Sequence, residues 1–165
     1  MEQSDKEILL NPLSSVKFNG ILGFQINDSM EDVFSRGKSL NLMSDDEIQE
    51  QKSAIVNFGS DISSKEIVIS GEGKLEEISR IVFSWNPISK ILDLIMVQFK
   101  PEQNLEMQIG QIREKVSFYL KRPDHDWRFG YYYITLDLQP FRLNDDSNIS
   151  FAPALSFNYD NFKTE

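Results

Sequence analysis

The sequence contains no cysteine and only one histidine, His125, among its 165 residues. A chain without cysteine cannot form a disulfide, a thiolate zinc site or a cysteine nucleophile. A single histidine leaves most nucleophilic mechanisms without their usual base and a zinc ion without enough ligands. We therefore expect neither a metal nor a cofactor, and the composition favours a non-catalytic protein over an enzyme.

Long apolar runs and a basic leader are also missing. The chain begins with the polar segment Met1–Glu7, and the apolar residues Ile8–Leu10 that follow are too few for a secretion signal. The run Ile91–Val97 is interrupted by Asp93 and falls short of the roughly 20 residues that a membrane helix needs. We therefore expect a soluble, cytoplasmic protein.

The abundance of isoleucine, asparagine and lysine relative to arginine suggests a bacterial source.

Basic residues are scarce compared with acidic ones. The chain has 17 lysines and arginines against 26 aspartates and glutamates, which gives a net charge of −9. This charge opposes the phosphate backbone, whose binding depends on clustered basic side chains, so we expect no nucleic-acid partner. An acidic balance favours solubility and steers a protein toward a basic protein partner.

The composition supports one hydrophobic core, because 40% of the residues are hydrophobic and 12% are aromatic. No linker or low-complexity segment divides the chain. We therefore expect a single domain over residues 1–165, with 1–15 and 159–165 as candidates for frayed ends.

Three segments carry helix signals. Asp28 and Glu31 have the spacing of a capping box, and so do Ser44 and Glu47, which predicts a second helix over Asp45–Lys52. The apolar residues of Pro101–Lys121 recur at steps of three and four, as on one face of a long helix.

Seven segments are typical of β-strands or hairpins. Ile149–Phe157 contains Pro153, which predicts an edge strand or a bend. Lys90–Phe99 is apolar on both faces, so we expect it to be central or to meet another chain with one face. This order of elements predicts an α+β fold. It has an antiparallel sheet of about five to seven strands with two or three helices packed mainly on one face. The seven segments are Val16–Ile26, Ala54–Phe58, Lys65–Ser70, Ile78–Trp85, Lys90–Phe99, Phe129–Leu138 and Ile149–Phe157.

Aromatic residues are dense late in the chain. Alternation along Phe129–Leu138 assigns Tyr132 to the core and leaves Tyr131 and Tyr133 on the opposite face. Aromatic side chains serve both as core residues and as interface anchors, so this face either covers a second packed layer or binds a partner. The candidate partner-binding residues are Trp127, Phe129, Tyr131, Tyr133 and Asp137.

Two other interpretations of the sequence remain open. In the first, the protein binds a small molecule in an apolar pocket between sheet and helices, lined by Phe83, Trp85, Met96 and Ile112. In the second it is an enzyme, for which His125 beside Asp126 is the available acid or base. Homodimerisation through a strand edge is compatible with each of these interpretations.

Two segments of the sequence are Phe24–Val33 and Leu120–Pro123 followed by Tyr131–Tyr133. They resemble segments of small bacterial immunity-type and inhibitor-like α+β proteins. The first looks like the strand and helix start of such proteins, and the second is similar to their helix, proline turn and aromatic strand. The chain has Arg122 where these proteins have a glycine just before the proline. The resemblance implies a non-catalytic protein that acts by binding a partner.

Overall fold

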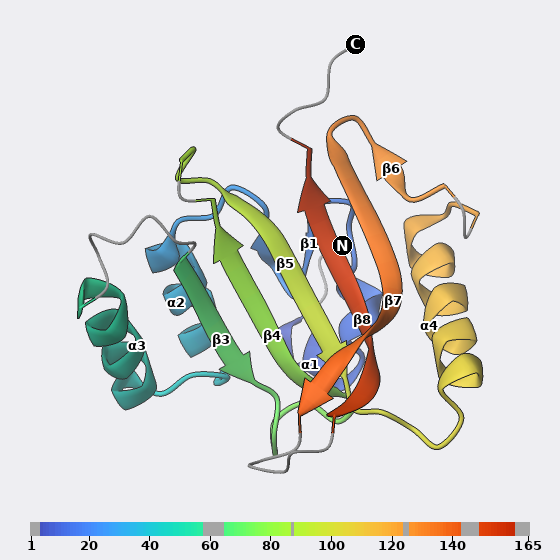
Figure 1. The fold of residues 1–165 in the computed structure, drawn as a ribbon, viewed down its shortest axis with the longest axis horizontal. Coiled ribbons are helices and arrows are strands. Elements are labelled where there is room, and N and C mark those ends of the chain that lie inside the picture. Colours follow the sequence, from blue (N-terminus) through green and yellow to red (C-terminus); the bar gives the residue numbers. More distant parts are fainter. Residues whose placement is uncertain (1–3, 58–64, 87, 124–125, 143–148, 161–165) are drawn as a thin grey trace.

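The main feature of the fold is a six-stranded antiparallel sheet with the order β3-β4-β5-β8-β7-β6 (Figure 1). The computed structural model describes residues 4–57, 65–86, 88–123, 126–142 and 149–160. The predicted α+β fold with an antiparallel sheet is confirmed. The strands are β3 (Lys65–Ser70), β4 (Ile78–Trp85), β5 (Leu92–Phe99), β6 (Arg128–Phe129), β7 (Tyr132–Arg142) and β8 (Ile149–Tyr159).

Two helices and a small hairpin lie behind one face of this sheet, and two further helices stand at its two sides. In Figure 1, α1, α2 and the hairpin lie behind the sheet, whereas α3 stands beside β3 and α4 near β7. The hairpin consists of β1 (Gly20–Ile21) and β2 (Phe24–Gln25). The helices are α1 (Asp5–Leu10), the 3-10 turn η1 (Pro12–Ser15), α2 (Met30–Ser39), α3 (Asp45–Asn57) and α4 (Leu105–Leu120).

The core lies between the sheet and the elements behind it. On β4 and β5, alternate side chains such as Phe83 and Ile95 are fully buried, and Phe83 contacts Phe24 of the hairpin with 4.8 Å between ring centroids. The other face of the sheet carries Val82 and Met96, which are opposite each other in the register. The prediction that Lys90–Phe99 forms a central strand is confirmed, because β5 lies between β4 and β8.

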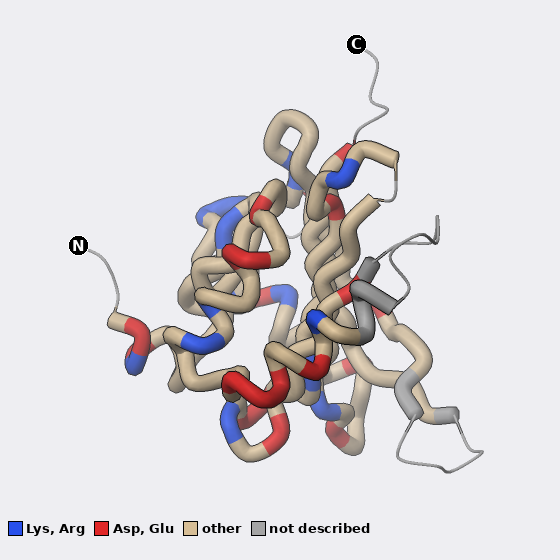
Figure 2. The backbone as a smooth tube through the Cα atoms, turned by 90° about the vertical axis from the view of Figure 1, so that its left-hand side faces the viewer, with Lys and Arg blue, Asp and Glu red and all other residues tan. Residues whose placement is uncertain are grey.

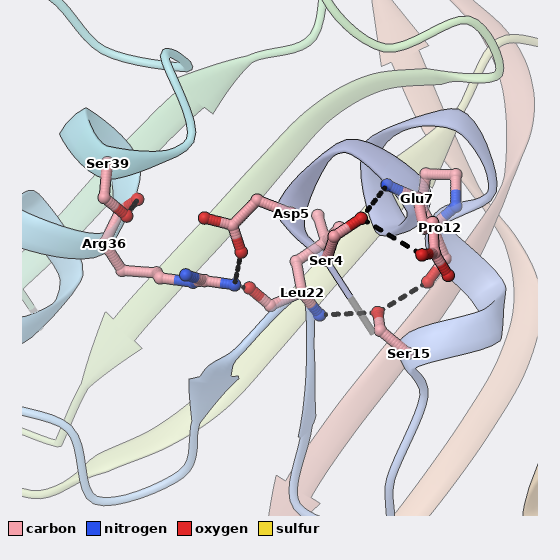
Figure 3. A network of polar contacts seen from close by, with 8 residues as sticks. All are labelled: Ser4, Asp5, Glu7, Pro12, Ser15, Leu22, Arg36 and Ser39. Carbon is pink, nitrogen blue, oxygen red and sulfur yellow. Dashed lines mark hydrogen bonds and ion pairs between the residues drawn. The ribbon is translucent and has the colours of Figure 1, made fainter. Parts of the chain in front are cut away.

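The N-terminal segment packs onto the core, although we expected residues 1–15 to include a frayed end. Ile8 of α1 and Leu13 of η1 are buried. Figure 3 shows how polar contacts tie this segment to the hairpin. Leu22 in the hairpin turn donates its amide to Ser15 Oγ at 2.8 Å, and its carbonyl accepts from Arg36 Nε at 2.9 Å. The same guanidinium pairs with Asp5 at 3.2 Å.

The start of α2 differs by one residue from the prediction. Ser29, not Asp28, is the N-cap, and Asp32 completes the capping box instead of Glu31. Asp28 is engaged elsewhere, because its Oδ2 accepts a hydrogen bond of 2.9 Å from the amide of Gln25 at the end of the hairpin. Burial raises the pKa of this carboxyl, and the bond from Gln25 opposes that rise.

The second predicted capping box is confirmed, but the helix that follows it is longer than expected. Ser44 donates its amide to Glu47 Oε1 at 2.8 Å, and the Glu47 amide donates to Ser44 Oγ at 3.2 Å. Residues 54–57 continue α3 to Asn57, so the strand predicted for Ala54–Phe58 is wrong. The intrinsic preference of β-branched residues against helix is only a fraction of ~1 kcal/mol each, and a capped helix propagates through them.

The long helix α4 ends one residue before the predicted end and starts four residues after the predicted start. Its N-cap is Asn104, whose Oδ1 accepts from the Met107 amide at 3.0 Å. The preceding loop is held by the side chain of Gln108, which donates to the Lys100 carbonyl and accepts from the Glu102 amide. These bonds give the loop a fixed course outside the helix.

The last two strand predictions need correction. The segment Phe129–Leu138 is not one strand, because the chain reverses at Gly130, with φ of 63°, to form the β6–β7 hairpin. The strand that contains Pro153 is central, between β5 and β7. Pro153 lies one residue beyond Ala154, the last residue paired with β5, so the proline avoids that ladder.

Candidate functional site

A groove of about 660 Å³ lies where three elements distant in the sequence meet. Its walls come from the end of α1, from the loop before β4 and from the C-terminal half of α4. Asn11 Nδ2, at the end of α1, donates a 3.0 Å hydrogen bond to Tyr119 Oη of α4. This bond joins two of the walls, so the groove is held by contacts within the chain.

The groove has an apolar part formed by two side chains. Leu10 of α1 is 76% exposed and Phe118 of α4 is 73% exposed, and both line the groove. Phe118 is in edge contact with Tyr119, with 5.1 Å between ring centroids. Large apolar side chains that are exposed together, and surrounded by polar ones, are typical of protein interaction sites.

The polar part of the groove is predominantly acidic. Glu76 and Glu77 line it from the loop before β4, and Glu114 lines it from α4, against the single basic residue Lys115. The groove therefore favours a ligand that combines apolar groups with positive charge. On the α3 side of the molecule, by contrast, acidic and basic residues are interspersed (Figure 2).

The five residues predicted to bind a partner do not form one surface. Trp127 is 7% exposed and donates from Nε1 to Ser117 Oγ at 3.2 Å, so it belongs to the core beside α4. Phe129 is 58% exposed and stacks on Phe18 of the N-terminal segment, with 5.6 Å between ring centroids. The hairpin at Gly130 separates these two residues from the strand that follows.

The other three residues of that prediction lie on or next to β7. Tyr131 is in the turn, where its ring contacts Tyr159 at 5.8 Å between centroids. Tyr133 is half-buried beneath the guanidinium of Arg128, at 4.6 Å from its ring centroid. Asp137 is exposed on the sheet face that the helices leave uncovered. Its Oδ1 accepts from Gln139 Nε2 at 2.9 Å.

The predicted apolar pocket is not formed by its four residues. Phe83, Trp85 and Ile112 are buried in the core between sheet and helices. Met96 lies on the other face of the sheet, opposite Val82. The prediction failed because β5 is apolar on both faces, so its sequence does not tell which apolar residues face the helices.

Neither apolar residue of the groove was predicted from the sequence, although one of them carries a signal. Phe118 falls outside the stripe of apolar residues at steps of three and four that marks the buried face of α4. A large aromatic residue off the buried face of a helix is a candidate contact residue. Leu10 gave no such signal.

Comparison with protein-family models, curated proteins and solved structures finds no match to this chain. None of the helices within the described ranges has the length and apolar character needed to cross a membrane. Within the same ranges, no three histidine or carboxylate side chains are grouped as metal ligands would be. His125, the candidate acid or base of the enzyme interpretation, lies outside the described residues.

Proposed function

We propose that the protein is a non-catalytic binding module whose acidic groove holds an apolar and basic segment of a partner protein. One observation carries this proposal: Leu10 and Phe118 are largely exposed in a groove that three glutamates and one lysine also line. Covering apolar surface contributes about 25 cal/mol per Å², and aromatic anchors in the centre of an interface carry much of its affinity.

The charges of the groove determine which partner it fits. Glu76, Glu77 and Glu114 repel an acidic segment and attract lysine or arginine, which speeds association and selects the partner. The net charge of −9 of the whole chain acts in the same direction at longer range. The partner is therefore a basic protein.

The resemblance to small bacterial immunity-type and inhibitor-like proteins supports the same role. It implies a non-catalytic protein that acts by binding a partner. A groove with two anchors and an acidic rim suits that mode of action.

The experiment is a capture of partners from the native cell lysate on the tagged full-length chain, at low and at high salt. We expect the wild type to capture one basic partner in stoichiometric amount. The variants Phe118→Ser and Glu114→Lys should each capture at least tenfold less of this partner. Since Phe118 is 73% exposed, its replacement leaves the core intact.

Met107→Ser and Ile88→Ser are the matched controls, because both residues are exposed and neither lines the groove. We expect these two variants to retain the partner. Undiminished capture by Phe118→Ser and Glu114→Lys together would rule out the groove as the binding site.

A further inference from the structure

The two edges of the main sheet differ in their hydrogen bonds. At the β3 edge, the side-chain amide of Gln51 from α3 donates to the Val68 carbonyl at 2.7 Å and accepts from the Val68 amide at 3.0 Å. The glutamine thus occupies the backbone groups with which a neighbouring strand would pair. The chain itself therefore occupies this edge at Val68, in the middle of β3.

At the other edge, β6 covers only the beginning of β7. It pairs with Tyr132 and Tyr133, and the carbonyl of Trp127 accepts from the Ile134 amide at 3.0 Å. Backbone groups alternate in direction along a strand, and the β7–β8 register has no shift. The amides and carbonyls of Leu136 and Leu138 therefore point away from β8, as the amide of Ile134 does.

The open stretch of this edge has a defined end. Pro140 has no amide hydrogen, and its carbonyl accepts a 3.2 Å hydrogen bond from Gln98 Nε2 of β5. No residue in the described part of the chain bonds to the outward backbone groups of Leu136 and Leu138. The unpaired stretch therefore runs over residues 135–139.

The side chains along this stretch determine what a paired strand would need. Leu136 is half-buried and Leu138 is 41% exposed, and both lie on the helix-covered face of the sheet. Asp137, between them, is exposed on the uncovered face. In an antiparallel pair that uses both leucines, the residue opposite Asp137 would be about 4.5 Å away between Cα atoms.

This arrangement disfavours a second copy of the chain as the paired strand. A two-fold pairing that uses the backbone groups of both leucines is centred on Asp137, so Asp137 would be opposite its own copy, and like charges directly opposite destabilise a sheet. A pairing centred on Leu136 would place Leu138 of the copy opposite Ile134, where Trp127 already lies. A pairing centred on Leu138 would place Leu136 opposite Pro140 of the copy, which has no amide to donate and whose carbonyl already accepts from Gln98. The edge therefore fits a strand of a different protein better than its own.

We propose that residues 135–139 of β7 accept an additional antiparallel strand from another protein, with an apolar residue opposite each leucine and a lysine or arginine opposite Asp137. Backbone hydrogen bonds to Leu136 and Leu138 supply affinity, and the charge opposite Asp137 selects the segment. This site goes beyond the groove and does not depend on it, because it uses none of the groove residues.

The test uses the ¹⁵N-labelled full-length chain and the peptide acetyl-Thr-Val-Lys-Val-Thr-amide. We expect the amide signals of Leu136 and Leu138 to shift, with a dissociation constant on the order of 1 mM because so short a strand buries little surface. The same peptide with glutamate in place of lysine should bind about tenfold more weakly to the wild type. With the Asp137→Lys variant, the preference between the two peptides should reverse.

The peptide with both valines N-methylated is the control for backbone pairing, and it should cause no shift. Equal binding of the lysine and glutamate peptides, or no shift at Leu136 and Leu138 at 10 mM peptide (about tenfold above the expected constant), would overturn the proposal. So would a wild-type chain that dimerises through the same stretch, as seen by sedimentation. Phe118→Ser should bind the peptide unchanged, so a failure of the groove and a failure of this edge are distinguishable.

Discussion

The β3 edge and the β7 edge belong to one sheet, yet the chain occupies the middle of the first and leaves residues 135–139 of the second open. Beside β3, α3 places Gln51 at hydrogen-bond distance from both backbone groups of Val68. Beside β7, the two-residue strand β6 stops early, and the outward groups of Leu136 and Leu138 stay unpaired within the described residues. One glutamine side chain can thus occupy, at a single residue, the backbone groups that an additional strand would use.

The open edge is nevertheless short and protected against its own copy. Unpaired edges promote aggregation unless a charge, a proline or a bulge interrupts them. Here Asp137 stands in the middle of the open stretch and Pro140 stands at its end. We infer that these two residues restrict which strands can pair with β7 and do not prevent pairing altogether.

The largest effect on this comparison is expected from Trp127→Ala. Trp127 is buried, and its backbone carbonyl holds Ile134 of β7. Its truncation should lower the free energy of unfolding by about 3–5 kcal/mol, as for other buried aromatic residues, and loosen β6 so that the open edge lengthens. Phe129→Ala, at an exposed position of the same hairpin, should cost less than about 1 kcal/mol. Urea denaturation of both variants measures the difference. Equal costs would contradict the assignment of Trp127 to the core.

A pair of proline substitutions tests the direction of the backbone groups in β7. Leu138→Pro removes an amide that is unpaired within the described residues, whereas Gln139→Pro removes one that points toward β8. We expect Gln139→Pro to cost about 2 kcal/mol more in unfolding free energy, because it leaves a buried acceptor on β8 without its donor. Denaturation of both variants under the same conditions measures this difference. A larger cost for Leu138→Pro would show that the open edge has been placed on the wrong residues.

Replacing Gln51 by alanine should open the β3 edge. The Val68 amide and carbonyl lose their partners, and we expect a loss of about 1 kcal/mol in unfolding free energy, since this edge is accessible to water. The Val68 amide should also exchange its hydrogen faster. Gln49→Ala is the matched control, because Gln49 is an exposed glutamine of the same helix. Unchanged exchange at Val68 in Gln51→Ala would show that the side-chain bonds do not protect this edge.

The sequence predicts much of the sheet but not how its edges end. β-Favouring residues bounded by turn residues identify β3 and β4 to the residue and β5 to within two residues, because the connections between these strands are short. The capping box at Ser44 and Glu47 is recognisable because both partners lie within four residues. Such local signals do not depend on tertiary contacts.

Contacts between distant residues explain what the sequence could not predict. Gln51 and Val68 are 17 positions apart, and nothing in their neighbourhood shows that they meet. The reversal at Gly130 is hidden because the aromatic residues on both sides of it continue an alternating pattern. Leu10 and Phe118 form a groove only because the fold brings α1 against α4.

We expect the protection of the β3 edge at Val68 to depend weakly on pH. The amide and the hydroxyl of Ser44 bind the Glu47 carboxylate at the start of α3, and these hydrogen bonds, with a smaller contribution from Lys74, lower the pKa of Glu47 from its ordinary value of 4.5. A carboxyl with a lowered pKa in the folded state contributes stability above its unfolded pKa and loses it as the pH falls through the folded pKa.

Since Gln51 lies one turn after Glu47, acid should loosen α3 and with it the bonds to Val68. We expect the protection of the Val68 amide against hydrogen exchange to fall below pH 4.5 in the wild type, and to be lower with a flatter pH dependence in Ser44→Ala, which lacks the capping hydroxyl. Glu50→Gln, in the same helix, is the control. The protection of its Val68 amide should have the same pH dependence as in the wild type. The effect is small because the Glu47 side chain is 46% exposed and solvent screens its interactions. An identical pH dependence in the wild type and Ser44→Ala would show that the capping box of α3 does not contribute to the protection of the Val68 amide.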